Sequence, residues 1–494
     1  VYKRQGSCVI SGGTAAGGNR FFRFSGFDTR GAINDVLIQS GGQRNVVVGV
    51  TAPSGTVVDK PVSLSGQANL FWLSPGGITL SGAGGFLNVG QLSLSTAPTL
   101  RFGNGLFDVV GSTPEQLASL QADPLPGAAG LEDSAEQRTV LGLPADPRIA
   151  LEGIHIRVDR GLLLDAGPLG STLVRDSVLD ASSSAGVGGT LTLTGQQVEV
   201  LGASVLDARG SDGGGTIQVG GSWQNSDLTV RQALRTVVDP GARLDASATE
   251  RGHGGEVVIW SAVADPGSST AASGTVLARG GAGGGDGGRI ETSGHRLSIN
   301  QIQIDTAAPQ GRHGEWLVDP FNIAITNSSS TGMNGFTAVA NSSILDVSSL
   351  VSALQAGNVT VSTGGAGSAG NQTGSIELYA PIHFNAGSLG SLVLDAYGDV
   401  AFGCGQNVCI DAANAAANAG YIELRSATGG FHSLAGTGSI VLNGSAALTI
   451  DQGGMTPGKG WYGGLRGGSL VKKGGGDLIL LSNQVDPGLS LIHI

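Results

Sequence analysis

The sequence is poor in charged and aromatic residues, which excludes several classes of protein. Only 13% of its residues are charged and 5% are aromatic. The net charge is −11, and lysine and arginine form no run longer than two residues. Because nucleic acids bind to clustered positive charge, we predict no nucleic-acid partner. No apolar stretch approaches the ~20 residues that a membrane-spanning helix needs.

Cysteine is scarce as well. The three cysteines, Cys8, Cys404 and Cys409, are too few for a disulfide scaffold. The spacing of Cys404 and Cys409 matches neither a Cys-x-x-Cys redox pair nor the usual spacing of zinc ligands. Under oxidising conditions the two could close a small loop, or both could be free, small apolar residues. The sequence predicts no metal site and no cofactor.

The motifs of known β-helical polysaccharide-degrading enzymes are also missing. Acid/base hydrolysis of a glycosidic bond needs paired carboxylates, yet the chain has no Asp-Asp pair, no Asn-Thr-Asp and no Arg-Ile-Lys. His253 and His313 each precede a glycine and are interpreted as turn residues. Asp286 lies in a segment that resembles a calcium-binding nonapeptide, but Ala282 replaces one of its glycines. We therefore predict that the chain is not an enzyme.

Glycine is abundant, with 86 residues, and short apolar runs separate the glycines. Examples are GTLTLTG (189–195), GTIQVGG (215–221) and GEVVIWS (255–261). Alternation within a run, as at Leu191 and Leu193, places apolar side chains on one face of a β-strand. The glycines between the runs suit tight turns.

A longer repeat lies over these runs. Leu179-Asp-Ala181, Leu206-Asp-Ala208 and Leu244-Asp-Ala246 each precede a polar, glycine-containing turn. Such self-similarity is typical of a solenoid, in which each repeat buries its apolar face against its neighbours. The short turns cannot hold the helical crossovers of a βαβ fold. We therefore predict an all-β fold, a right-handed parallel β-helix; spacing alone also allows an antiparallel sandwich.

Two segments interrupt the strand pattern. Residues Ser112–Arg138 are polar and contain three prolines, and Thr113-Pro114 resembles a helix start with proline at the first position. A short helical and loop excursion is expected there, with a helix over Glu115–Gln121. A second short helix is expected over Ser349–Gln355.

Both ends of the sequence have the character of cloning artefacts. Leu489–Ile494 can be encoded by a transposon-type sequencing adaptor, and the reverse complement of that adaptor translates to Val1–Gln5. We interpret residues 1–5 and 489–494 as adaptor scars and exclude them from the fold prediction.

The segment from Ile10 to Phe107 resembles the secretion domain of two-partner-secreted exoproteins of the filamentous haemagglutinin type. Asn19–Phe24 is similar to the opening block of that family, and Gln67–Ile78 is similar to its Asn-Leu…Asn-Pro-Asn-Gly-Ile stretch. Ser74 and Gly76 stand where the family usually has asparagines, which puts any role of those asparagines in doubt. The residues that match the secretion motif are Asn19, Phe21, Phe22, Asn69, Leu70, Phe71, Pro75, Gly77, Ile78 and Asn88.

Later segments follow the same order as in this family. GGEVVIWS (254–261), GGRIETSG (287–294) and GEWLVDPFNIAIT (314–326) resemble the boundary signature of the large exoproteins. Residues 468–481 resemble the transport-associated repeat of autotransporter passengers. The resemblance implies a secretion domain over residues 6–111, a β-helical repeat region over 112–315 and a second β-helical region over 316–488.

The resemblance also implies a function. It predicts a secreted bacterial surface adhesin, exported through the periplasm and then the outer membrane. Its export partner would be an outer-membrane β-barrel transporter with periplasmic recognition domains. The β-helical rod would mediate adhesion or display, with receptors or glycans on host or neighbouring cells as its ligands. Two alternatives remain: the stalk of a contact-dependent toxin or cytolysin that lacks its C-terminal effector, and a β-helical polysaccharide-degrading enzyme.

Overall fold

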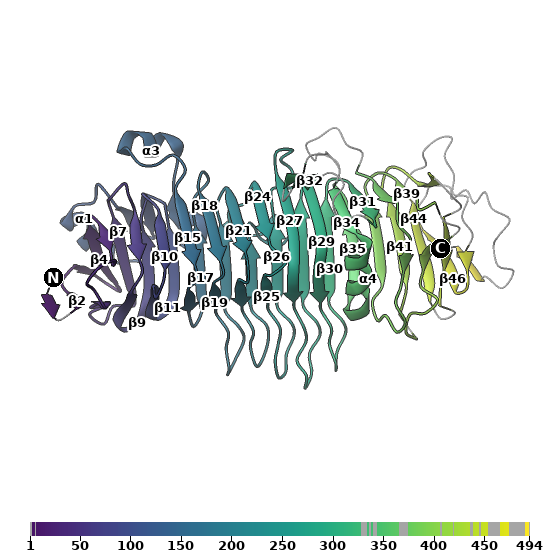
Figure 1. Ribbon diagram of the computed structural model, residues 1–494, viewed down its shortest axis with the longest axis horizontal. Helices are drawn as coiled ribbons and strands as arrows, with labels where there is room; N and C mark the ends of the chain where they lie inside the picture. The colour runs from purple at the N-terminus through teal and green to yellow at the C-terminus, as the bar shows by residue number, and fades with distance from the viewer. Residues whose placement is uncertain are drawn as a thin grey trace. The chain divides into compact units, whose positions relative to one another are not determined.

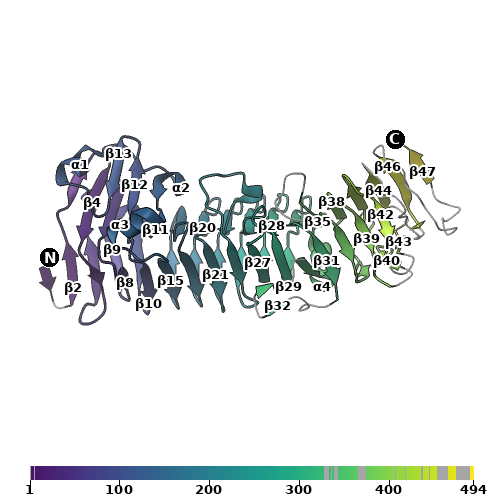
Figure 2. The same cartoon turned by 90° about the horizontal axis from the view of Figure 1, so that it is seen from above.

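The chain forms two compact units, Val1–Ala246 and Ser247–Ile494. The computed structural model describes residues 2–4, 6–327, 333–334, 337–338, 343–364, 374–405, 408–417, 419–434, 438–443, 446–452, 465–473 and 490–493. Both units consist mostly of strands in long parallel sheets, as the all-β prediction requires (Figures 1 and 2). No helix in these ranges is long and apolar enough to cross a membrane.

Strands in the second half of the first unit fall into three rows, in which each strand pairs in parallel with the strand one repeat away. The first row contains β15 (Arg148–Glu152), β18 (Ser171–Arg175), β21 (Gln197–Leu201) and β24 (Arg235–Val238). The second contains β16 (His155–Arg157), β19 (Val178–Asp180), β22 (Val205–Asp207) and β25 (Arg243–Asp245). The third contains β17 (Gly161–Asp165), β20 (Thr190–Thr194) and β23 (Thr216–Val219).

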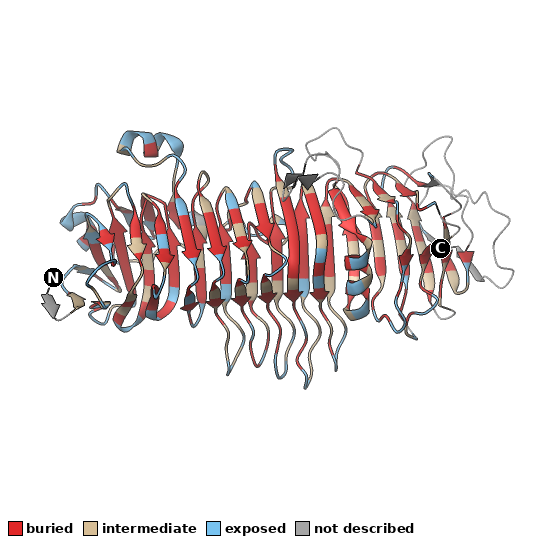
Figure 3. Cartoon of the chain, in the orientation of Figure 1, coloured by how far each residue is buried: buried red, intermediate tan, exposed pale blue. Residues whose placement is uncertain are grey.

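The core of this unit consists of apolar side chains stacked in register. Leu179 pairs with Leu206, and Leu206 with Leu244, and all three are fully buried. Leu191 and Ile217 stack in the same way in the third row. Figure 3 shows the buried residues concentrated along the strands. Each such side chain stabilises the fold by about 1.5–3 kcal/mol, so the alternation in the sequence is what specifies the register.

The amino-terminal half of the first unit mixes parallel and antiparallel pairs. The parallel strands are β2 (Ser7–Ile10), β4 (Asn19–Phe24), β5 (Phe27–Asp28), β6 (Asp35–Ile38), β7 (Asn45–Val50), β8 (Thr56–Val58), β9 (Pro61–Leu73), β10 (Ile78–Ser81) and β11 (Gly85–Ser95). The antiparallel pairs join β1 (Tyr2–Arg4) to β2, β3 (Thr14–Ala16) to β4, and β12 (Thr99–Phe102) to β13 (Gly105–Asp108) and β14 (Leu131–Glu132). Pairing in this part is therefore less uniform than the repeat pattern predicts.

The polar segment over residues 112–138 leaves the parallel rows. It contains α1 (Pro114–Ser119), α2 (Gly127–Gly130) and the start of α3 (Ala135–Leu141). Thr113 caps α1, and Pro114 occupies its first turn. The segment covers an apolar cluster that includes Phe21, Phe102 and Phe107. Leu117 and Leu131, which belong to the segment, are part of the same cluster. The excursion is therefore packed onto the unit.

Glycine-rich loops follow β19 and β22 and extend away from the sheets (Figure 1). Neighbouring loops hydrogen-bond through their backbones: the Ser183 amide donates to the Arg209 carbonyl at 2.8 Å, and the Ser183 carbonyl accepts from the Ser211 amide at 3.1 Å. A Cβ atom on Gly188 would lie 1.9 Å from the carbonyl oxygen of Ala208, so only glycine allows this approach.

The second unit repeats the arrangement. One row contains β26 (Glu256–Trp260), β28 (Arg289–Gly294), β30 (Glu315–Pro320), β35 (Asn358–Ser362), β38 (Leu392–Ala396), β41 (Ile422–Ser426), β44 (Ala447–Gln452), β46 (Ser469–Lys473) and β47 (Ser490–His493). Another contains β27 (Ser269–Leu277), β29 (Arg296–Asp305), β34 (Ser343–Asp346), β31 (Ile323–Thr326), β36 (Ile376–Leu378), β39 (Val400–Phe402) and β42 (Phe431–Ser433). A third contains β37 (Ile382–His383), β40 (Val408–Asp411), β43 (Ser439–Val441) and β45 (Leu465–Arg466). The helix α4 (Val347–Ala356) spans the expected Ser349–Gln355, and β32 (Met333–Asn334) pairs antiparallel with β33 (Thr337–Ala338).

Two further sequence predictions concern the division of the chain and the cysteines. The boundary between the two units falls after Ala246, inside the predicted region 112–315. The predicted end of the second region at residue 488, and most of the passenger-type repeat, lie outside the described residues. Cys404 and Cys409 form a disulfide in the second unit, and Cys8 is free.

Candidate functional site

The residues predicted for a secretion motif lie on neighbouring parts of the first unit. Asn19, Phe21 and Phe22 belong to β4, and Asn69, Leu70 and Phe71 belong to β9. Pro75 and Gly77 form the turn after β9, Ile78 begins β10, and Asn88 lies on β11. The structure thus brings the two asparagines of β4 and β9 onto one sheet, whereas Asn88 bonds separately, through Nδ2, to the Leu64 carbonyl at 2.9 Å.

Most apolar residues of the motif are buried. Phe21 is part of the apolar cluster below the excursion, where its ring centroid lies 5.7 Å from that of Phe107. Phe22, Leu70 and Ile78 are buried as well, and Phe71 is partly buried. These side chains hold the unit together, so a partner that meets the folded unit contacts other residues.

The asparagines form a ladder across three strands. Asn45, on β7, pairs with Asn19 on one side and with Asn69 on the other. Nδ2 of Asn69 donates to Oδ1 of Asn45 at 2.8 Å, and Nδ2 of Asn45 donates to Oδ1 of Asn19 at 2.9 Å. Asn19 in turn donates to the carbonyls of Leu120 and Ala122, at 2.8 and 2.7 Å. The three amides therefore point the same way and fasten the excursion to the sheet.

Arg160 closes the other end of this ladder. The register between β9 and β11 shifts between Val89 and Leu92, and the two residues there, Gly90 and Gln91, do not continue the ladder with an asparagine. Nη2 of Arg160 instead donates to Oδ1 of Asn69 at 2.6 Å. Asn45 and Arg160 were not among the sequence-predicted site residues. The separations of 26 residues from Asn19 to Asn45 and 24 residues from Asn45 to Asn69 are the signal that could have found the ladder.

The two departures from the family pattern have a structural basis in this chain. The Ser74 hydroxyl is fully buried, accepts a hydrogen bond from Thr56 at 3.0 Å and donates to the Gly77 carbonyl at 2.8 Å. A Cβ atom on Gly76 would lie 2.4 Å from the carbonyl oxygen of Ala52, so this turn has no space for an asparagine. The turn is therefore closed by a serine and by glycine.

Three cavities lie along one face of the sheet that contains β9, β11 and β17. One of about 330 Å³ lies between Arg44 and Arg160 and is also lined by Asn69. A second of about 180 Å³ shares Arg44 and Asn69 with it and extends below the excursion. A third of about 190 Å³ shares Gln91 and Leu163 with the second. Side chains from neighbouring strands thus line a series of adjoining hollows, which is where a ligand could bind.

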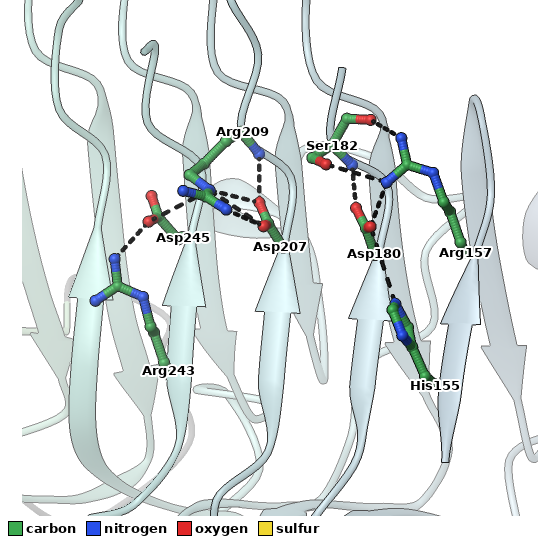
Figure 4. A network of polar contacts seen from close by, with 8 residues as sticks. All are labelled: His155, Arg157, Asp180, Ser182, Asp207, Arg209, Arg243 and Asp245. Carbon is green, nitrogen blue, oxygen red and sulfur yellow. Dashed lines mark hydrogen bonds and ion pairs between the residues drawn. The ribbon is translucent and has the colours of Figure 1, made fainter. Parts of the chain in front are cut away.

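A second polar cluster follows the Leu-Asp-Ala repeats (Figure 4). Asp180 pairs in register with Asp207, and Asp207 with Asp245. Guanidinium groups lie between these carboxylates: Arg209 contacts Asp207 at 2.6 Å and Asp245 at 3.9 Å. The pKa of Arg209 is raised, mainly by its hydrogen bond to Asp207. These ion pairs offset the repulsion between the stacked carboxylates, so we assign the cluster a role in holding neighbouring repeats together.

The histidines singled out in the sequence bond to backbone groups of the second unit. His253 Nδ1 accepts from the Asp286 amide at 3.0 Å, and His313 Nδ1 accepts from the Ala308 amide at 3.3 Å. Asp286 forms an ion pair with Arg312. Across the described residues, no group of three or more His, Cys, Asp and Glu side chains could hold a metal ion.

The chain was compared with protein-family models and with curated proteins. Neither comparison returned a match.

Proposed function

We propose that the chain is a right-handed parallel β-helix of the two-partner secretion type. In this proposal residues 6–111 direct export through an outer-membrane β-barrel transporter with periplasmic recognition domains. The remainder forms a rod at the bacterial cell surface that mediates adhesion or display. The observation that carries the proposal is the strand register of the parallel rows: each strand in a row pairs with the strand one repeat away, as Val174 does with Val200.

Such pairing suits export of an unfolded chain. Each new repeat can bury its apolar side chains on the repeat that has already folded, without contacts to distant parts of the sequence. Val200 is fully buried between Val174 and Val238. Because burial of each such residue releases about 1.5–3 kcal/mol, folding outside the membrane would favour outward movement. This coupling needs no nucleotide hydrolysis.

The disulfide is compatible with the same route. Cys404 and Cys409 are separated by only 5 positions. A bond over so short a loop constrains its own turn and leaves the remainder of the chain extended. Distant cysteines joined in the periplasm would instead hold a folded segment that a pore cannot pass.

The proposal is tested by secretion. The chain, preceded by a signal peptide, is produced in a Gram-negative host together with a panel of two-partner transporters, and the protein in the medium is quantified. We expect export with at least one transporter, and loss of most of it in Val200→Asp, which puts a charge into the core. The exposed neighbour Gln197→Asp is the matched control. Export of Val200→Asp at the original level would overturn the coupling, and no export with any transporter would overturn the assignment.

A further inference from the structure

The cavity at the end of the asparagine ladder has the features of a ligand site. Its volume is about 330 Å³, and it is lined by Arg44, Gln67, Asn69, Asp159 and Arg160 among others. All these residues belong to the first unit. It is open to solvent, since Arg160 and Asp159 are exposed.

Arg160 is the cation of this cavity that has no acidic partner. Throughout residues 6–327, all of which are described, no carboxylate lies within ion-pair distance of its guanidinium, and its side chain donates only to Asn69. Arg44, on the opposite side, is paired with Asp123 at 2.5 Å. The hydrogen bond from its Nη2 to Asn69, whose own Nδ2 donates to Asn45, orients the Arg160 guanidinium. A guanidinium held in this way binds a carboxylate through two parallel hydrogen bonds.

The remaining groups of the cavity suit hydroxyls. Asp159 accepts a hydrogen bond from Gln67 at one carboxylate oxygen, so the other oxygen can accept from a ligand hydroxyl. A bare sulfate has no proton to donate to this carboxylate, whereas a group that carries a carboxylate beside several hydroxyls can meet Arg160 with one end and Asp159 with the other. A uronic acid residue has that composition.

Glycine at position 90 leaves space in the cavity. A Cβ atom there would lie 3.3 Å from Nη2 of Arg160 and 3.6 Å from Oδ1 of Asn69. The adjoining cavities continue along the sheet past Ser93 and Thr190, so neighbouring sugars would meet hydroxyl side chains and the ring of Phe71.

We propose that this cavity binds a uronate residue of an acidic polysaccharide, with Arg160 on the carboxylate and Asp159 and Gln67 on the hydroxyls. The inference rests on the proposed role in adhesion. It names the class of ligand and the cavity that binds it. It assigns the binding to the first unit, close to the predicted secretion motif.

The test is calorimetric binding to the purified full chain. The probes are an oligogalacturonate, the corresponding neutral oligogalactose, and inorganic sulfate and phosphate. We expect the oligogalacturonate to bind and the neutral oligomer not to. Arg160→Gln should weaken binding at least about tenfold, since a paired guanidinium–carboxylate contact is lost. Arg175→Gln, an exposed arginine on β18, is the matched control.

A second variant separates loss of the site from loss of the fold. Gly90→Val fills the cavity and keeps the charge of Arg160, and it should also abolish binding while circular dichroism stays unchanged. Equal binding of the neutral oligomer, binding of sulfate and phosphate alone, or unchanged binding by Arg160→Gln would each overturn the proposal. The binding assay uses purified protein and does not depend on export. A failure to bind oligogalacturonate therefore does not affect the result of the secretion experiment, and a failure of secretion does not affect the binding result.

Discussion

Nη2 of Arg138 lies 2.6 Å from Oδ2 of Asp133, although the two side chains are only 1% and 0% exposed. The same guanidinium donates to the carbonyls of Pro75 at 3.0 Å and Thr96 at 2.6 Å. Burial raises the pKa of Asp133, and the hydrogen bond and positive charge of Arg138 oppose that rise. Arg138 therefore joins α3 to the turn after β9, which is the turn of the predicted secretion motif.

Replacement of Arg138 should be strongly destabilising. Arg138→Met leaves a buried carboxylate and the carbonyls of Pro75, Thr96 and Pro144 without their donor. Removal of one partner of a buried pair costs about 3–5 kcal/mol. Urea unfolding at pH 7 measures the loss. Val140→Ala, at an 80% exposed position of the same helix, is the control and should change little. Addition of Asp133→Asn should restore part of the stability, and equal effects of Arg138→Met and the control would contradict this account.

The asparagine ladder allows a second prediction. Asn45→Leu removes the middle amide and leaves Oδ1 of Asn19 and Nδ2 of Asn69 without their partner. Unsatisfied buried polar groups cost about 1–3 kcal/mol each, so the free energy of unfolding should fall by at least that amount. Hydrogen exchange should also show faster opening of residues 120–122, since the carbonyls of Leu120 and Ala122 accept from Asn19. If exchange there stays unchanged, the ladder does not hold the excursion.

A third prediction concerns the turn where this chain departs from the family pattern. Gly76→Asn restores the usual asparagine but places its Cβ 2.4 Å from the Ala52 carbonyl oxygen, so the backbone must move. We expect a loss of about 1–3 kcal/mol, typical of overpacking. Gly26→Asn is the matched control, because a Cβ there meets nothing within 4 Å. Equal thermal midpoints for the two variants would show that the turn has space after all.

The buried carboxyl of Asp319 should make the stability of the second unit depend on pH. Burial, with a smaller contribution from the charge of Asp395, raises its pKa from 3.8 to about 6. Between these values the folded chain keeps a proton that the unfolded chain releases, so stability falls as pH rises from about 4 to above 6. Asp319→Asn removes the buried charge. It should raise the free energy of unfolding at pH 7.5 by at most about 3 kcal/mol. The gain should be smaller than this limit because the side chain is half-buried and solvent screens its charge.

The comparison of two pH values serves as the control for this variant. At pH 4 the carboxyl is protonated in the folded chain, so Asp319→Asn should bring almost no gain. Urea unfolding at both values gives the difference directly. A gain of equal size at pH 4 and pH 7.5 would mean that the amide improves packing and that the charge of Asp319 has no part in it.

Strand periodicity could be predicted from the sequence because it is local. Leu191 and Leu193 alternate with polar residues inside one short run, and both are fully buried. The start of α1 was predictable for the same reason, since Thr113 and Pro114 act on the turn that follows them. The right-handed coil and the secretion role still rest on the resemblance.

The candidate sites could not be predicted in the same way, because they depend on contacts between distant residues. Arg138 bonds to carbonyls 63 and 42 positions away, and nothing near it in the sequence marks it as buried. Arg160 reaches Asn69 across β11, at the point where the register between β9 and β11 shifts. A bulge of this kind inserts a residue without a strong sequence signal. The antiparallel pairs of the amino-terminal half were missed for a similar reason, since the repeats do not extend to them.

The stacked carboxylates in Figure 4 lead to a last prediction, about salt. Asp207 and Asp245 are 12% and 2% exposed, and Arg209 lies between them while it remains 46% exposed. Arg209→Gln leaves Asp245 with Arg243, at 2.7 Å, and removes the ion pair of Asp207. Because Arg209 is solvent-accessible, we expect a loss of only about 0.5–1 kcal/mol at low ionic strength. In 1 M salt the wild-type advantage should shrink, since the Debye length falls to about 3 Å. Parallel urea titrations with Arg175→Gln as control would contradict this account if the two variants behaved alike at both salt concentrations.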